Sequence, residues 1–167
     1  TGAIANTTYH IWLIQRSDTL VVDALFSTSA TSPTMPTNYD RTRRIGSILR
    51  EAGVIVVFKQ YGDVFKRAAV NVVSTTTDYG STLTSMAIPV GVKQEVLFTT
   101  VATPAAASSV IFGCGDADTG SATINQGAGP GGSNTIASYT PGGVITNTSA
   151  QIYTALSITG TVGSFIV

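Results

Sequence analysis

The chain has 167 residues, which fits one domain, and 43% of them are hydrophobic, which is enough for a core. Its nine basic and nine acidic side chains cancel, so the basic excess typical of nucleic-acid binders is missing. Only 11% of the residues are charged, less than half of the roughly 25% usual in soluble domains. This favours a surface partly buried against other chains, although a Thr-rich β-protein can be charge-poor by itself.

Three features limit the chemistry and the location. No apolar run reaches the roughly 18 residues of a membrane helix, so we expect no membrane insertion. The start, TGAIA, lacks Met and a secretory signal, which predicts a fragment whose missing part is N-terminal. Cys114 is the only cysteine, which excludes an internal disulfide and a cysteine-based zinc site. We expect it to be a small buried residue between two glycines, and we expect no metal or cofactor.

The first part of the chain predicts a hairpin meander of strands and turns. Residues 9–15 carry apolar side chains on both faces, which is typical of a central strand. A turn at 16–19 follows. Residues 20–27 and 54–60 are nearly continuous apolar runs, which predict strands covered on both sides by a second sheet or a neighbouring subunit. Gly53 separates the second of these runs from the strand before it.

The rest of the chain predicts further strands and almost no helix. Only 47–52 and 102–109 could be argued as helical, and both also suit strands or loops. Turn signals lie at 89–91 and 141–143. We therefore predict an all-β, antiparallel β-sandwich of jelly-roll type, with residues 1–167 as a single domain. The further strands are expected at 67–73, 81–88, 94–101, 108–113, 134–139, 150–158 and 162–167.

Charge is distributed unevenly along the chain. Lys93 is the last basic residue and Asp118 the last acidic one, so residues 119–167 carry no charged side chain. An exposed surface of this kind would promote association. We expect this third to lie largely within a homo-oligomer; the alternative is that it supplies the inner strands of an ordinary sandwich.

Four blocks follow one another in residues 1–65: YHIWLI, VVDALFSTSATSPTMP, YDRTRRIGSI and FKQYGDVF. In this order they resemble a domain of bacteriophage and prophage tail fibre, or receptor-binding, proteins, usually met toward the C-terminal end. Later residues match only in their Gly, Ser, Thr and Ala content. The resemblance implies a virion location, a homotrimeric fibre head, and host adhesion through a bacterial surface receptor such as a glycan or lipopolysaccharide.

Two other functions stay open: a structural knob that trimerises the fibre without touching a receptor, and a carbohydrate-binding or hydrolytic module of a bacterial enzyme. We expect no enzyme and no catalytic residue. His10 lies mid-strand beside Trp12, which is typical of a core histidine rather than a triad member. Glycosidase chemistry needs two carboxylates held in a cleft, and most acids here fall in turns.

The densest charge cluster is Arg41, Arg43 and Arg44. Strand alternation predicts that Arg41 and Arg43 face one way and Arg44 the other. Guanidinium groups could grip an acidic sugar or a lipopolysaccharide phosphate. We favour the structural alternative, in which they pair across strands with Asp40, Glu51, Asp63 or Asp23, but keep Arg41 as a candidate receptor contact.

The other candidate receptor contacts lie in or beside expected loops, where tyrosine can expose both ring and hydroxyl. The segment GDADTG resembles half of a calcium loop but lacks the distal Glu, so we expect an Asp-rich turn. A formal dinucleotide fingerprint at 127–132 contains Pro130 and lacks a following acid, so we expect a flexible surface loop over 113–133. Besides Arg41, the candidate receptor contacts are Tyr39, Tyr61, Tyr79, Asp116, Asp118 and Tyr139.

Overall fold

The computed structural model describes residues 4–61, 64–68, 70–97, 99–104, 108–122, 124–128, 136–139, 143–160 and 162–167. These residues form strands, turns and loops without a helix, and every strand pair is antiparallel, which confirms the all-β prediction. The described part therefore holds no helix of the length and apolarity needed to cross a membrane.

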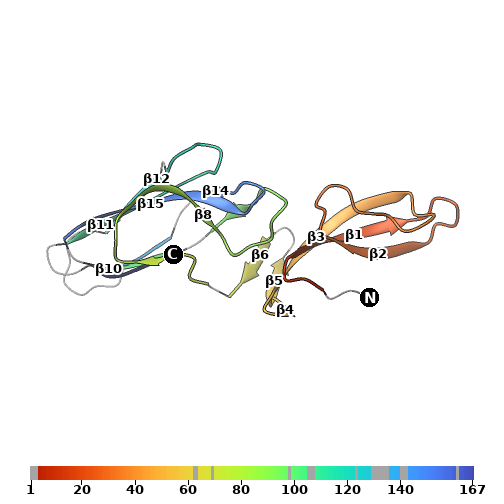
Figure 1. Ribbon diagram of the computed structural model, residues 1–167, viewed down its shortest axis with the longest axis horizontal. Helices are drawn as coiled ribbons and strands as arrows, with labels where there is room; N and C mark the ends of the chain where they lie inside the picture. Colours follow the sequence, from red (N-terminus) through yellow and green to blue (C-terminus); the bar gives the residue numbers. More distant parts are fainter. Residues whose placement is uncertain are drawn as a thin grey trace. The chain divides into compact units, whose positions relative to one another are not determined.

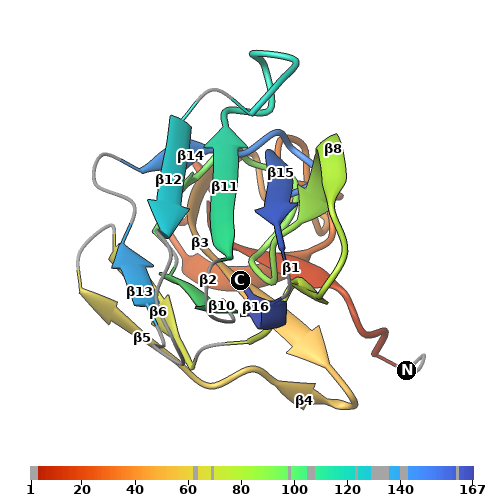
Figure 2. The same ribbon diagram turned by 90° about the vertical axis from the view of Figure 1, so that its left-hand side faces the viewer.

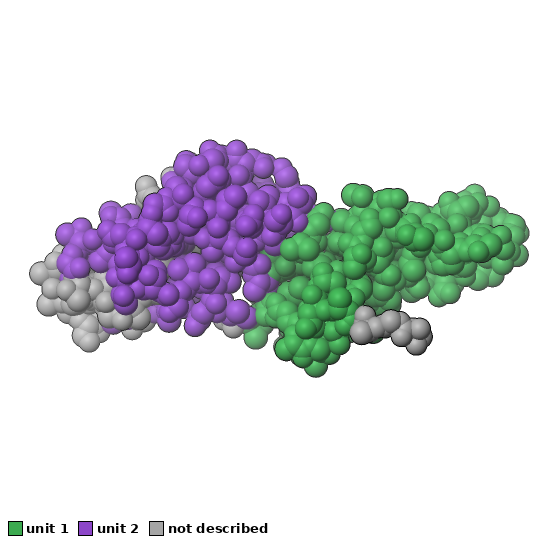
Figure 3. Space-filling view, viewed as in Figure 1, with its two compact units in different colours: residues 1–69, 88–91 green, residues 70–87, 92–167 purple. Residues whose placement is uncertain are grey.

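The expected single domain over 1–167 contains two compact units (Figure 3). Unit 1 consists of Thr1–Ala69 and Ile88–Gly91, and unit 2 of Val70–Ala87 and Val92–Val167. A short segment from the middle of the chain, Ile88–Gly91, thus belongs to the unit formed by the N-terminal residues.

Unit 1 is built on the meander that the sequence predicts. Its sheet has the order β2-β1-β3-β4, with β1 in the interior (Figure 1). Ala52 and Gly53 form the turn between β3 and β4, and both have positive φ. The expected strand 54–60 is interrupted and contributes to two elements. The strands are β1 (Thr8–Gln15), β2 (Val22–Ser27), β3 (Arg41–Glu51) and β4 (Val54–Ile55), followed by a hairpin of β5 (Phe58–Tyr61) and β6 (Val64–Arg67).

The alternation of β1 gives the unit 1 sheet one covered face. His10, Trp12 and Ile14 are buried, as is Thr8. The Trp12 indole N–H donates to the carbonyl of Ser29 (3.3 Å), in the loop after β2. The Val90 backbone N–H donates to Thr8 Oγ1 (3.0 Å), which ties the segment 88–91 to this face.

The apolar runs 20–27 and 54–60 were expected to be covered on both sides. Instead Val22 is 56% exposed and Val57 is 86% exposed. The loops at Ser29 and Val90 contact the covered face of the sheet, whereas Val22 and Val57 are left exposed. The expected cover on both sides is therefore wrong for these two residues within the chain, and cover by a neighbouring subunit stays a prediction.

Unit 2 contains two four-stranded sheets, as a sandwich requires. The first has the order β12-β11-β15-β8, and Figure 2 shows its strands side by side. The second has the order β13-β10-β16-β7, and a short ribbon pairs β14 with β9. The strands are β7 (Ser74–Thr75), β8 (Tyr79–Ser85), β9 (Glu95–Val96), β10 (Thr99–Pro104), β11 (Ser109–Gly115), β12 (Ile124–Ala128), β13 (Ile136–Tyr139), β14 (Val144–Ile145), β15 (Gln151–Thr159) and β16 (Val162–Ile166).

The core of unit 2 lies on one face of β11 and β15. Phe112, Ile152 and Leu156 are buried there. Cys114 is fully buried between two glycines, as predicted. Strand β15 belongs to the uncharged C-terminal third and lies between β11 and β8 in its sheet. For this strand the alternative explanation holds, namely that the uncharged third supplies inner strands of a sandwich.

Three local predictions are wrong. Residues 70–73 are not a strand, although 67–73 was expected to be one. The expected strand 94–101 is two strands, β9 and β10. The expected loop 113–133 begins inside β11 and contains β12, because Ile124 to Ala128 pair with β11 despite their glycine. Residues 123 and 129–133 of that segment lie outside the described residues. The jelly-roll connectivity and the threefold assembly stay predictions.

Candidate functional site

The seven predicted contact residues are divided between the two units. Tyr39 and Arg41 belong to unit 1, and Tyr79, Asp116 and Asp118 to unit 2. Tyr61 and Tyr139 end strands β5 and β13, and their side chains lie outside the described residues. Among the seven, Tyr79 lies at a concave surface.

An open depression of about 460 Å³ lies on the first sheet of unit 2. Ile111 pairs with Ser157, and Gly113 pairs with Ala155, across β11 and β15. By alternation these four residues lie on the face opposite the buried core. The floor of the depression is low because Gly113 has no side chain and Ala155 has only a methyl group. The depression is lined by Asp78, Tyr79, Gly80, Ile111, Gly113, Ala155, Leu156 and Ser157.

Asp78 supplies a fixed carboxylate at this depression. Its Oδ1 accepts a hydrogen bond from the Ile158 backbone N–H (2.8 Å), while Oδ2 accepts none from the described residues. The Ser157 side chain is exposed, and Ile111 is 47% exposed. A carboxylate, a hydroxyl and an apolar surface in one shallow site suit a sugar ring, which presents hydroxyl groups at its edge and C–H groups on its faces.

Tyr79 lies beside the depression, but its side chain joins the buried face of the sheet and is not an exposed contact. Its hydroxyl lies 3.3 Å from Oγ1 of the fully buried Thr154. Burial raises the pKa of Tyr79, and the hydrogen bond with Thr154 opposes this shift. The expectation that Tyr79 exposes its hydroxyl beside a loop is therefore wrong, because the residue begins a strand whose inner face it joins.

Asp116 and Asp118 already have protein partners. Asp116 Oδ1 accepts a hydrogen bond from the Ile145 backbone N–H (2.7 Å), and Asp118 forms an ion pair with Lys93. Within the described residues, no three His, Cys, Asp or Glu side chains gather as metal ligands. The segment GDADTG is the turn that follows β11, in agreement with the expectation of an Asp-rich turn.

The arginine cluster alternates as predicted, but its expected partners are taken. In the register of β3 with β1, Arg43 lies opposite Leu13 and Arg44 lies opposite Trp12, so the two arginine side chains lie on opposite faces of the sheet. None of the three arginines forms an ion pair with a described carboxylate. The expected pairing is therefore wrong for every partner that the structure describes. Asp40 is bound by the N–H and hydroxyl of Ser17, Glu51 pairs with Arg67, Asp23 accepts from the Ala24 N–H, and Asp63 lies outside the described residues.

Tyr39 and Asp40 lie at the β3 end of the long loop after β2. The Tyr39 backbone N–H donates to the Pro36 carbonyl (3.2 Å), and the ring is partly exposed. The Ser17 hydroxyl is the main cause that lowers the pKa of Asp40, and the charge of Arg41 adds to it. This end of unit 1 therefore presents polar groups, the Asp40 carboxylate among them.

His10 is a core histidine, as predicted. It is 1% exposed, and its Nδ1 lies 2.8 Å from Ser47 Oγ. Burial lowers its pKa, and the charge of Arg44 adds to the effect. The imidazole therefore stays neutral in the folded protein near pH 7.

Sequence reasoning missed Asp78, Ser157 and Ile111 as site residues. A usable signal was present in the small residues inside strand patterns, Gly80, Gly113 and Ala155. Glycine in a strand interior often marks a bulge or a place that another group approaches closely. What was missing is the pairing that brings these positions together from three strands.

Comparisons of the chain with protein-family models, with curated proteins and with solved structures find no match.

Proposed function

We propose that this chain is the distal head domain of a phage tail fibre or spike, which attaches the virion to a bacterial surface glycan or lipopolysaccharide. The observation that carries the adhesive role is the depression on β8, β15 and β11, with Asp78, Ser157 and Ile111 at an exposed sheet face. The resemblance of residues 1–65 to tail fibre proteins supports the virion location.

The charge of unit 2 indicates which part of a glycan or lipopolysaccharide the depression would bind. One basic side chain stands against four acidic ones, a formal charge of −3. A carboxylate in an acidic unit repels phosphate and acidic sugars. The depression therefore suits a neutral or amino sugar, and the anionic groups of lipopolysaccharide would lie elsewhere.

A shallow site of this kind binds weakly by itself. In a trimeric head the same depression occurs three times, and several fibres act on one virion. Linked weak contacts then become lasting attachment, because each later contact forms at a high effective concentration.

The test is binding of the chain to an array of bacterial surface glycans and purified lipopolysaccharides. Ser157→Trp fills the depression from an exposed position and should lower the affinity for any bound glycan at least about tenfold. Asp78→Asn keeps an acceptor for the Ile158 N–H but removes the charge, and should weaken binding about five- to tenfold. Ser85→Trp, exposed at the other end of β8, is the matched control.

Glycan binding that Ser157→Trp and Ser85→Trp leave equally strong would reject the depression as the receptor site. A chain that binds nothing on the array, and does not compete with virions for host cells, would favour the second candidate function, a structural knob of the fibre. That candidate is favoured by one observation of its own, the exposed apolar side chains of unit 1.

A further inference from the structure

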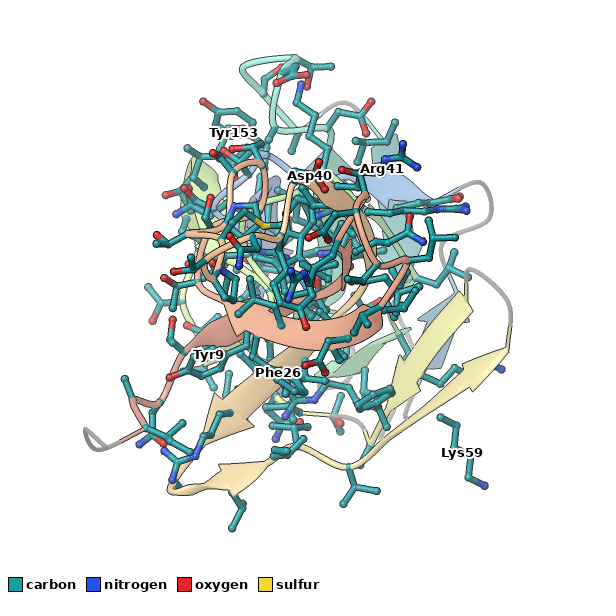
Figure 4. The ribbon with its side chains drawn as sticks, turned by 90° about the vertical axis from the view of Figure 1, so that its right-hand side faces the viewer. Tyr9, Phe26, Asp40, Arg41, Lys59 and Tyr153 are labelled. Atoms are coloured by element: carbon teal, nitrogen blue, oxygen red, sulfur yellow. The ribbon has the colours of Figure 1, made fainter. Side chains whose placement is uncertain are left out.

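One face of the unit 1 sheet is open. Three cross-strand rows lie on it, each with one residue from β2, β1 and β3. Phe26 is 57% exposed and Leu13 is 40% exposed. Phe26 and Arg41, both labelled in Figure 4, belong to the two end rows. We call this set the open face: Phe26–Ile11–Gly46, Ala24–Leu13–Arg43 and Val22–Gln15–Arg41.

The open face is unusual for the surface of a monomer. Leu20 and Val21, in the turn before β2, are exposed as well and extend its apolar area. Contiguous apolar surface of this kind marks an interaction site more often than a free surface. Arg41 and Arg43 add two positive charges that no described carboxylate neutralises by an ion pair.

The zero net charge of the chain hides a separation of charge between the units. Unit 1 has eight basic and five acidic side chains, a formal charge of +3, and unit 2 has −3. A surface of unit 2 is therefore a partner of the right sign for the open face. In an assembly of identical chains, every copy supplies both signs.

The ribbon of β9 and β14 is the surface of unit 2 that matches in both charge and apolarity. Val96 and Val144 are buried, while Glu95 is exposed, Leu97 is 56% exposed and Ile145 is 48% exposed. The Asp116 carboxylate joins the ribbon through the Ile145 N–H, and Asp118 follows two residues later. With Lys93 paired to Asp118, this surface has a formal charge of −2 against +2 on the open face. We call it the acidic ribbon: Glu95, Leu97, Asp116, Asp118 and Ile145.

We propose that the open face of one copy of this chain packs against the acidic ribbon of a second copy. The contact has an apolar centre formed by Leu13 and Val22 against Leu97 and Ile145, with charges of opposite sign around it, which is the usual anatomy of a protein interface. It rests on the self-association of the proposed fibre head, and it names the surfaces that associate.

The two surfaces differ, so the contact is heterologous, and its repetition closes into a ring or continues as an open polymer. The threefold arrangement that the resemblance implies is a closed ring of this kind. The interface then involves the most charged part of the chain, residues 1–69, and not only the uncharged C-terminal third.

The experiment is the solution mass of the 167-residue chain by light scattering over a concentration series. The double variant Arg41→Glu/Arg43→Glu should weaken association at least about tenfold, because it places like charges opposite each other. Glu95→Lys/Asp118→Lys should do the same from the other side. The chain that carries all four changes should regain the wild-type mass, because its charges are complementary again. Lys59→Glu/Lys66→Glu, which reverses two exposed unit 1 charges on β5 and β6, is the matched control and should leave the mass unchanged.

Leu13→Gln and Ile145→Gln test the apolar centre at exposed positions, where folding tolerates the change, and each should also weaken association. Far-UV circular dichroism and Trp12 fluorescence verify folding of every variant. A wild-type chain that is monomeric at all concentrations overturns the proposal. A mass unchanged by Arg41→Glu/Arg43→Glu also overturns the proposal. So does a quadruple variant that is folded but stays dissociated.

The two proposals fail separately. If Ser157→Trp abolishes glycan binding while the chain is a monomer, the adhesive function stands and the contact between copies is rejected. If the quadruple variant restores the oligomer while no glycan binds, the contact between copies stands and the adhesive function is rejected.

Discussion

At the scale of single residues, His10 links the stability of unit 1 to pH. Its folded-state pKa is lowered by burial and by Arg44, whereas in the unfolded chain it returns to about 6.5. The unfolded state therefore binds a proton more readily. The stabilisation is fully present above the unfolded pKa and decreases as the pH falls from about 6.5 toward the lowered folded pKa. Urea midpoints followed by Trp12 fluorescence from about pH 8 to about pH 5.5 should show this decrease.

His10→Asn is the control for this prediction, since an amide can still bond Ser47 but does not titrate. Its midpoint should be lower than that of the wild type at pH 8 but nearly constant down to pH 5.5. A wild-type midpoint that is equally constant would mean that the folded imidazole takes up its proton as freely as the unfolded one.

Gly91 is fixed by its neighbours and by its backbone. A Cβ at this position would lie 2.8 Å from His10 Nε2 and 2.9 Å from Ala30 Cβ, and φ is +95°. Gly91→Ala should destabilise unit 1 by about 1–3 kcal/mol, because both the contacts and the backbone conformation oppose a side chain. Gly46→Ala, where a Cβ meets nothing within 4 Å, should cost nothing measurable. Equal urea midpoints for the two variants would contradict the placement of the segment 88–91 on His10.

At the scale of elements, the β3–β4 hairpin contains a replaceable residue. Ala52 and Gly53, with φ of 47° and 83°, form a two-residue turn in which both positions are left-handed. Asparagine tolerates this conformation and alanine does not favour it. Ala52→Asn should therefore stabilise unit 1 by about 0.5–1 kcal/mol, and Ala52→Val should destabilise it by about 1–2 kcal/mol. Thermal melting of both variants tests the order, and a valine variant as stable as the asparagine variant would exclude this turn.

The elements differ in how far the sequence predicts them. Strand β1 was predicted to within one residue, because its apolar alternation lies between clear turn signals. Strand β12 was missed, because Asn125, Gln126 and Gly127 have low strand propensity and become a strand only by pairing with β11. The buried character of His10, Trp12 and Cys114 was predicted from local pattern. The depression was not, because its lining comes from three strands.

At the scale of the whole molecule, we expect the two units to report separately on unfolding. Trp12 is the only tryptophan and belongs to unit 1, while the fully buried Ile152 belongs to unit 2. Ile152→Ala should destabilise unit 2 by about 2–5 kcal/mol through lost burial and the cavity left behind. The urea midpoint by far-UV circular dichroism should fall, and that by Trp12 fluorescence should stay. An equal fall of both midpoints would show that the units unfold as one.

By itself, the sequence determined the class of the fold, the central strand β1, the alternation of Arg43 and Arg44, and the burial of the only histidine, tryptophan and cysteine. These properties follow from local periodicity and residue type, which act within one strand and its turns. Only the tertiary structure decided which residues share a surface. The pairing of β11, β15 and β8 made a depression from distant positions, and the register of β1 with β2 and β3 placed apolar and arginine side chains on one open face. The reason is that strand pairing joins residues far apart in the chain, and a shift of one residue would turn every side chain to the other face.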